Sequence, residues 1–146
     1  MNVEIFIDDQ YEETTVKIYT KTYSKEIDWI KDQVLGHPQD KITAFSGDDV
    51  EILAYRDILR FYGLDNKVYL DTMNNTYTTR LRLYQLEDRL PKKQFIKISR
   101  SEIVNLDYVK SLDLSFSGTI ALELKNGQVT YVSRRSLKNF KEALGL

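Results

Sequence analysis

Apolar positions in the first 40 residues change from alternating to helical spacing along the chain. Residues 3–8 and 14–20 alternate apolar and polar side chains, which predicts the two strands of an antiparallel hairpin. In residues 24–36 the apolar side chains instead recur at intervals of three and four, and Ser24 can cap the first turn of the helix that this spacing predicts. The repeating apolar positions are Ile27, Ile30 and Val34. We therefore predict a ββα element over residues 1–40, ending in the glycine- and proline-containing segment that follows the helix.

Short apolar runs separated by turn residues dominate the chain from residue 41 onward. Asn126–Gly127 is the strongest two-residue hairpin signal in it, and helical spacing is confined to residues 82–90 and to the C-terminal end. Alternation and β-branched residues predict the strands, which are 42–45, 50–54, 67–72, 76–79, 108–114, 119–124 and 128–132. The pattern predicts a mainly β domain over residues 41–146.

Composition excludes several classes of protein. The 146 residues suffice for one domain and a short appendage, with 42% hydrophobic residues to form a core. Cysteine is absent and there is one histidine, which excludes disulfide frameworks, thiolate metal sites and multi-histidine sites. No apolar run approaches the roughly 20 residues needed to span a bilayer, and the first residues do not form a secretory signal. We therefore expect a cytoplasmic protein without a cofactor.

Charge is distributed unevenly although the net charge is only −1. Residues 1–88 contain 10 basic and 17 acidic side chains, whereas residues 89–146 contain 11 basic and 5 acidic ones. Screening confines an electrostatic field to roughly 8 Å at physiological salt, so a basic C-terminal part can attract a polyanion even in a neutral protein. A solvated basic face of a stable domain remains an equally good interpretation.

Catalytic motifs are absent from the sequence. The six glycines are scattered singly, so no phosphate-binding loop forms, and no Gly-x-Ser-x-Gly elbow occurs. His37 lies beside Pro38 in the predicted linker, where an exposed imidazole is the simplest interpretation. The acidic pairs lie in turns without the spacing of a cation site. We predict neither an enzyme nor a metal site.

Basic residues beside predicted turns are the strongest candidate chemistry. Lys67 begins a strand, Arg100 follows a short strand that starts at Phe95, and Arg134–Arg135 follow Ser133 at the predicted start of the last helix. Arginine is unfavourable at a helix N-terminus, so the pair suggests a role other than stability. Nearby serine hydroxyls suit phosphate oxygens, and arginine can bind guanine through two hydrogen bonds. Ordinary surface charge is the alternative.

Three ordered motifs carry a resemblance to a known family. Residues 95–109 resemble the signature of the LytTR DNA-binding domain of bacterial regulators, which typically has a phenylalanine, a basic residue, a His-x-Ser or similar triplet and an asparagine. Residues 122–140 give a second match, and Asp57–Ile58 with Phe61–Tyr62 gives a third. The resemblance covers about residues 45–146. This chain departs from the pattern in having Ser99 where many members have histidine.

The resemblance implies a LytTR-like stack of small antiparallel sheets with short helices, whose loops enter successive major grooves of double-stranded DNA. Carried over to this chain, the loop contacts correspond to Lys67, Arg100 and Arg135. Placement beside them makes other residues candidate phosphate contacts, namely Ser99, Ser101, Arg134 and Lys138. We thus expect a sequence-specific transcription regulator. The alternative is a protein-interaction module on a β-rich scaffold with residual DNA affinity.

The resemblance also implies partners. About 45 residues are too few for a receiver domain, which takes about 120, so we expect a stand-alone regulator that binds paired half-sites as a homodimer. Such members are often encoded beside a small membrane protein that restrains them, which makes this a possible second partner. The acidic residues 1–40 should face away from the phosphates and serve dimerisation or regulation.

Overall fold

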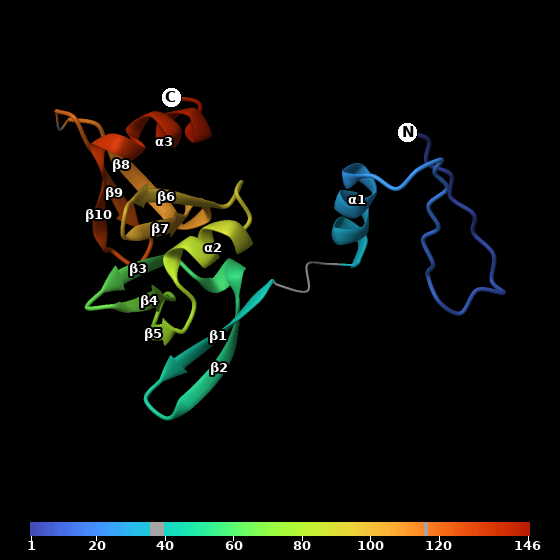
Figure 1. The fold of residues 1–146 in the computed structure, drawn as a ribbon, viewed down its shortest axis with the longest axis horizontal. Helices are drawn as coiled ribbons and strands as arrows, with labels where there is room; N and C mark the ends of the chain where they lie inside the picture. The colour runs from blue at the N-terminus through green and yellow to red at the C-terminus, as the bar shows by residue number, and fades with distance from the viewer. Residues whose placement is uncertain (36–39, 116) are drawn as a thin grey trace. The chain divides into compact units, whose positions relative to one another are not determined.

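Two compact units make up the chain in the computed structural model, which describes residues 1–35, 40–115 and 117–146 (Figure 1). The first unit spans Met1–Pro38 and the second Gln39–Leu146. Most of the predicted boundary segment, residues 36–39, lies outside the described residues. The two units are described separately below.

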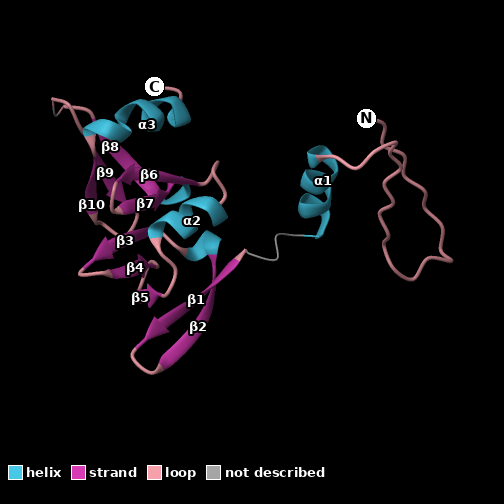
Figure 2. Ribbon diagram, in the orientation of Figure 1, coloured by secondary structure: helices cyan, strands magenta, loops and turns pink. Residues whose placement is uncertain are grey.

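Residues 1–35 of the N-terminal unit contain one helix, α1 (Lys25–Leu35), and residues 1–24 contain no strand (Figure 2). The helix prediction is confirmed, and the prediction of a hairpin over residues 3–8 and 14–20 is wrong. An isolated two-stranded hairpin needs a covered apolar face to be stable in water, and Phe6 and Ile7 are 79% and 95% exposed here. The alternation is present in the sequence, but this unit provides no surface on which it can be buried.

The second unit contains a seven-stranded and a three-stranded sheet, both antiparallel (Figure 2). The large sheet has the order β2-β1-β5-β4-β3-β7-β6 and the small sheet the order β10-β9-β8. The strands are β1 (Lys41–Ser46), β2 (Asp49–Ala54), β3 (Arg60–Leu64), β4 (Lys67–Asp71), β5 (Thr76–Thr79), β6 (Phe95–Ser99), β7 (Glu102–Asn105), β8 (Val109–Asp113), β9 (Ile120–Leu124) and β10 (Val129–Val132). This confirms the predicted mainly β fold of small antiparallel sheets.

Short helices close the faces of these sheets. Helix α2 (Leu83–Arg89) covers one face of the large sheet through Leu86, and Phe140 of α3 (Leu137–Leu144) packs into a second core that side chains of both sheets form. Short 3-10 turns in the described part of the domain join neighbouring elements: η1 (Tyr55–Asp57) and η2 (Leu106–Tyr108) connect strands, and η3 (Arg134–Ser136) connects β10 to α3. The two predicted helices of this unit are therefore present.

Strand β7 lies between two separate hydrophobic cores. Ile103 packs into the core beneath α2, whereas Val104 packs into the core shared with the small sheet and α3. All four residues of β7 are buried, because neighbouring side chains of a strand point to opposite faces and both faces are covered. The large sheet is thus the middle layer of a stack.

Asn105, the asparagine of the 95–109 motif, is a fully buried structural residue. Its Nδ2 donates to the carbonyl oxygen of Ile58 at 2.8 Å, and its Oδ1 accepts from the backbone N–H of Asp107 at 3.0 Å. A buried amide must have such partners, because an unpaired polar group in a core is costly. The asparagine fixes the loop before β3 against the end of β7.

Replacing this amide tests its structural role. Asn105→Ala leaves two backbone groups without partners and should lower the free energy of unfolding by about 2–3 kcal/mol in urea denaturation followed by circular dichroism. Asn139→Ala is the matched control, since Asn139 is exposed and has no side-chain hydrogen bond among the described residues; it should change stability by less than about 0.5 kcal/mol. Equal losses in both variants would contradict the assignment.

Candidate nucleic-acid interface

The β6–β7 turn carries Arg100 at its tip. Ser99 pairs with Glu102 across the two strands, so Arg100 and Ser101 form the turn between them. The backbone N–H of Ser101 donates to Ser99 Oγ at 3.3 Å and closes the turn. The side chain of Arg100 is exposed. This short turn therefore presents its guanidinium to solvent on a supported backbone.

Two backbone hydrogen bonds join this turn to neighbouring segments. The N–H of Gly63, near the end of β3, donates to the carbonyl oxygen of Ser101 at 2.8 Å. The N–H of Ser133, just before η3, donates to the carbonyl oxygen of Ile98 at 2.7 Å. The β3–β4 turn and η3 thus flank the β6–β7 turn, and Figure 1 shows the β3–β4 turn and the start of the η3–α3 segment on the same side of the domain.

The β3–β4 turn has two residues, and its conformation explains the position of Lys67. Asp65 and Asn66 have positive φ angles of 51° and 62°, which aspartate and asparagine tolerate better than most residues. Such a turn matches the right-handed twist of the strands that it joins. Leu64 pairs with Lys67, so the lysine is the first strand residue after the turn and is exposed.

The arginine pair of the C-terminal motif lies in η3. The prediction that Ser133 caps the last helix is wrong, because α3 begins at Leu137 and the Ser133 hydroxyl donates to Ser136 Oγ at 3.1 Å. The helix thus begins one turn after the predicted cap, at the first position of its apolar spacing, Leu137. Both arginines are exposed, and Arg134 lies against Gly118, where an added Cβ would come within 3.3 Å of its Nε.

A buried ion network fixes the strand that leads away from Arg100. Arg60 donates through Nε to Asp71 Oδ2 at 2.7 Å and through Nη1 to Glu102 Oε1 at 2.8 Å. Asp71 and Glu102 are 2% and 7% exposed. Burial lowers the pKa of Arg60, but the hydrogen bonds to both carboxylates raise it by more, so the net pKa is raised. The guanidinium therefore stays charged.

The carboxylate of Glu102 also connects the two sheets. The Thr130 hydroxyl on β10 donates to Glu102 Oε2, and the Thr76 hydroxyl on β5 donates to Asp71 Oδ1 at 2.8 Å. The network thus spans strands β5, β4, β3, β7 and β10. Because Glu102 directly follows Ser101, it holds the Arg100 turn to both layers of the stack.

The second unit of the chain is similar in sequence to a known DNA-binding domain. Residues 48–145 match the model of the LytTr DNA-binding domain. The chain belongs to the LytTR family. It is 33% identical to an uncharacterized HTH-type transcriptional regulator of Staphylococcus aureus strain MSSA476 and 32% identical to one of the bovine strain RF122, in each case over 100% of this chain and 99% of the relative.

A solved structure has the same fold. The chain is similar to the LytTr DNA-binding domain described as that of a methyl-accepting/DNA response regulator from Bacillus cereus. The TM-score is 0.71 at 27% identity, and the match covers 73% of this chain and 98% of that domain. The predicted LytTR resemblance is therefore confirmed.

The LytTR domain places all of its predicted contact residues at the surface. They come from the β3–β4 turn, the β6–β7 turn, η3 and the first turn of α3. None of the basic residues among these predicted contacts has a carboxylate of the described residues within ion-pair distance. Ser99 is partly buried and the others are exposed, namely Lys67, Arg100, Ser101, Arg134, Arg135 and Lys138. Their roles toward DNA stay predictions.

Two basic residues beside Lys67 were missed by the sequence analysis. Arg80 and Arg82 line the same hollow as Lys67, in the segment between β5 and α2. Both lie in the half of the sequence with an excess of acidic residues, so the count over residues 1–88 concealed them. Basic residues on both sides of a predicted hairpin would have been the signal to use.

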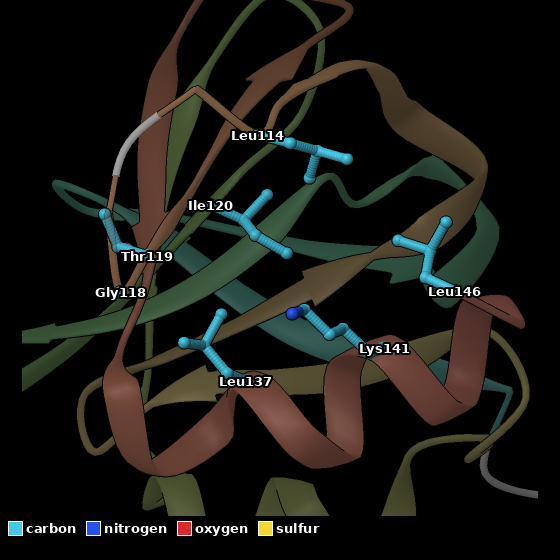
Figure 3. Close-up of a pocket in the computed structure, with 7 residues that line it drawn as sticks. All are labelled: Leu114, Gly118, Thr119, Ile120, Leu137, Lys141 and Leu146. Carbon is cyan, nitrogen blue, oxygen red and sulfur yellow. The ribbon is translucent and has the colours of Figure 1, made fainter.

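An apolar hollow of about 460 Å³ lies near η3 and has a different character (Figure 3). Ile120, Leu137 and Leu146 help to line it, and Lys141 on α3 is its one charged lining residue. A mostly apolar surface does not match a polyanion, so this hollow is not grouped with the basic residues of the β3–β4 turn, the β6–β7 turn and η3.

Metal and membrane sites receive no support within the described ranges. No group of three or more histidine, cysteine, aspartate or glutamate side chains is placed to hold a metal ion there. No helix in the described part of the chain is long and apolar enough to cross a membrane.

Removing the cation of the ion network should strongly destabilise the LytTR domain. Arg60→Met leaves the buried carboxylates of Asp71 and Glu102 unpaired and should lower the free energy of unfolding by about 3–5 kcal/mol. Lys97→Met removes the 3.3 Å ion pair with Glu87, which is exposed, and should cost less than about 1 kcal/mol. Urea denaturation of both variants measures the difference, and a loss below 1 kcal/mol for Arg60→Met would contradict the structural role of the network.

Proposed function

We propose that this LytTR protein is a sequence-specific transcription regulator that inserts basic loops into successive major grooves of double-stranded DNA. The observation that carries the proposal is the placement of Arg100 and Arg135. Both are exposed on short turns that a backbone hydrogen bond between Ser133 and Ile98 holds together, and neither has a carboxylate partner among the described residues. Unpaired guanidinium groups on a supported edge suit the recognition of a polyanion.

Arginine provides the sequence specificity in this proposal. A guanidinium can donate two parallel hydrogen bonds to O6 and N7 of guanine in the major groove, and its planar fork fixes their geometry as a lysine ammonium does not. Arg100 and Arg135 are assigned this role. The backbone contacts are assigned to residues beside them, namely Ser99, Ser101, Arg134 and Lys138, since phosphate contacts position a protein without specifying sequence.

The arrangement of helices favours loops over a recognition helix. A helix-turn-helix motif needs two helices joined by a turn of about three or four residues. Within the described residues of this domain, α2 and α3 are separated by the five strands β6 to β10. The S. aureus relatives are named HTH-type regulators, but this chain has no such helix pair in its described part.

Substitution of the two arginines tests the proposed base contacts. Arg100→Ala and Arg135→Ala should each weaken binding to a duplex selected from a random library by about 1–3 kcal/mol and relax the base preference at one position. Fluorescence anisotropy with the selected duplex and its single-base variants measures both effects.

Lys138→Gln is the comparison variant for this test. It should weaken binding to every duplex by a similar factor and reduce the salt dependence, because a lost phosphate contact releases one counterion fewer. The assignment fails if both arginine variants retain the affinity and base preference of the parent protein.

The N-terminal unit presents many apolar side chains to solvent, and we assign dimerisation to it. Where exposed apolar side chains gather into a contiguous patch, they commonly mark a protein interface. Trp29 on α1 is 61% exposed, and residues 1–24 contribute others, namely Val3, Ile5, Phe6, Ile7 and Tyr19. Two copies joined here would present two DNA-binding edges to paired half-sites.

A variant with Phe6→Ser and Trp29→Ser tests dimerisation. It should sediment as a monomer where the parent sediments as a dimer, and it should lose about tenfold or more in affinity for a paired site while its affinity for one half-site is unchanged. Tyr84→Ser is the matched control, because Tyr84 is 68% exposed on α2 outside this unit. Identical sedimentation of parent and double variant would remove the N-terminal unit from the interface.

The second candidate function is a protein-interaction module, which the same exposed apolar residues favour. In that case a partner protein, not a second copy, would cover Trp29. The random-library selection distinguishes the two functions. A sequence-specific regulator enriches particular sequences, whereas a module with only residual DNA affinity enriches none.

A further inference from the structure

A hollow of about 290 Å³ lies beside the β3–β4 turn and gathers three cations. Lys67, Arg80 and Arg82 line it, together with Asn66 and the neighbouring strand residues Thr78 and Thr79. We call the three basic residues and this hollow the basic cradle. No acidic side chain lines it.

Two of these cations flank the last pair of a strand ladder. Val68 on β4 pairs with Thr79 at the end of β5, so Lys67 precedes and Arg80 follows this pair, and both line the hollow. Like charges held close together repel each other. Within the described part of the chain, no carboxylate lies at ion-pair distance from Lys67, Arg80 or Arg82. The repulsion therefore lacks an internal counter-charge, and a bound anion would relieve it.

Other contacts hold both arginines in place before any ligand binds. Arg82 donates from Nη1 to the carbonyl oxygen of Asn66 at 3.1 Å, which ties it to the β3–β4 turn. The Arg80 guanidinium lies over the ring of Phe45, 4.6 Å from its centroid, in a cation–π contact. A guanidinium has five N–H donors, so each arginine keeps donors for a ligand. Such preorganisation lowers the entropic cost of binding.

We propose that the basic cradle binds a phosphodiester of the DNA backbone, and that Lys67 therefore contacts phosphate and does not recognise a base. The inference rests on the proposed DNA-binding function and adds Arg80 and Arg82 to it. Several cations converging on one hollow suit the compact charge of a phosphate, whereas base recognition needs a side chain that projects into a groove. The Gly63–Ser101 hydrogen bond sets the cradle beside the Arg100 turn, so that one duplex can reach both.

The test compares salt dependence with sequence preference in the full chain. Binding is measured by fluorescence anisotropy between about 50 and 300 mM KCl, with a duplex selected from a random library and a shuffled duplex of the same composition. One lost phosphate contact lowers the slope of log K against log salt by about 0.9, which corresponds to about eightfold weaker binding at 0.1 M salt. Arg80→Gln and Arg82→Gln should each show this loss on both duplexes, with the ratio of the two affinities unchanged.

Three further variants complete the design. Arg82→Lys keeps the charge and should retain the salt slope of the parent protein. Lys93→Gln is the matched control for removal of a cation, because Lys93 is exposed, has no ion pair among the described residues and precedes β6 at the strand end away from Arg100; its slope should not change. Arg100→Ala should lower the affinity ratio instead. Thermal melting of each variant confirms that it is folded.

Each outcome decides one proposal. If the parent binds the selected duplex and both glutamine variants keep its affinity and slope, the cradle does not bind the backbone while the DNA-binding function stands. If a glutamine variant loses affinity for the selected duplex alone, its arginine contacts a base and the inference is overturned. Inorganic phosphate at low millimolar concentration, with ionic strength held constant, is added as a competitor. If it displaces both duplexes from Arg80→Gln as readily as from the parent, the cradle does not bind the free anion. If the parent binds neither duplex, the proposed function itself fails.

Discussion

The register of the strand that follows Arg100 depends on one partly buried cation, the Arg60 guanidinium. Arg60 lies between the carboxylates of Asp71 and Glu102, and no other described residue forms an ion pair with either. Buried ion pairs contribute little net stability, since desolvation offsets their attraction. Their value here is positional: a shift of β7 by one residue would turn Glu102 to the opposite face and break the network. The register of β7 sets where Arg100 projects.

Stacking and the ion network together explain why a domain of this size can present loops with defined geometry. Strand β7 contributes Ile103 to one core and Val104 to the other, so both faces of the large sheet are fixed by packing. The turns at its edge have few internal contacts of their own. The buried strands fix the positions of these turns through the backbone hydrogen bonds of Gly63 and Ser133. A rigid scaffold that carries recognition on loops is a common division of roles in proteins.

Features that depend on neighbours along the chain could be predicted from the sequence, whereas features that depend on distant partners could not. The β6–β7 turn, the final helix and the family followed from local spacing and ordered motifs. The Arg60 network joins residues 11, 28 and 42 positions apart, which no local pattern indicates. Arg80 and Lys67 likewise line one hollow only because β4 pairs with β5, which brings the segment after β5 to the start of β4. The hairpin predicted over residues 3–20 failed for the converse reason, because alternation specifies a strand only where a surface exists to bury it.

Charge counted along the sequence is a poor guide to charge on a surface. The N-terminal 88 residues are acidic in sum, yet Lys67, Arg80 and Arg82 within them converge on one hollow. Asp71 of the same region is buried against Arg60, so these two charges neutralise each other away from the hollow. Because screening limits each charge to a few ångströms, only residues brought together by the fold act as one site. The proposed DNA-binding residues thus come from both halves of the sequence, with backbone binding proposed for the basic cradle and base recognition for Arg100 and Arg135.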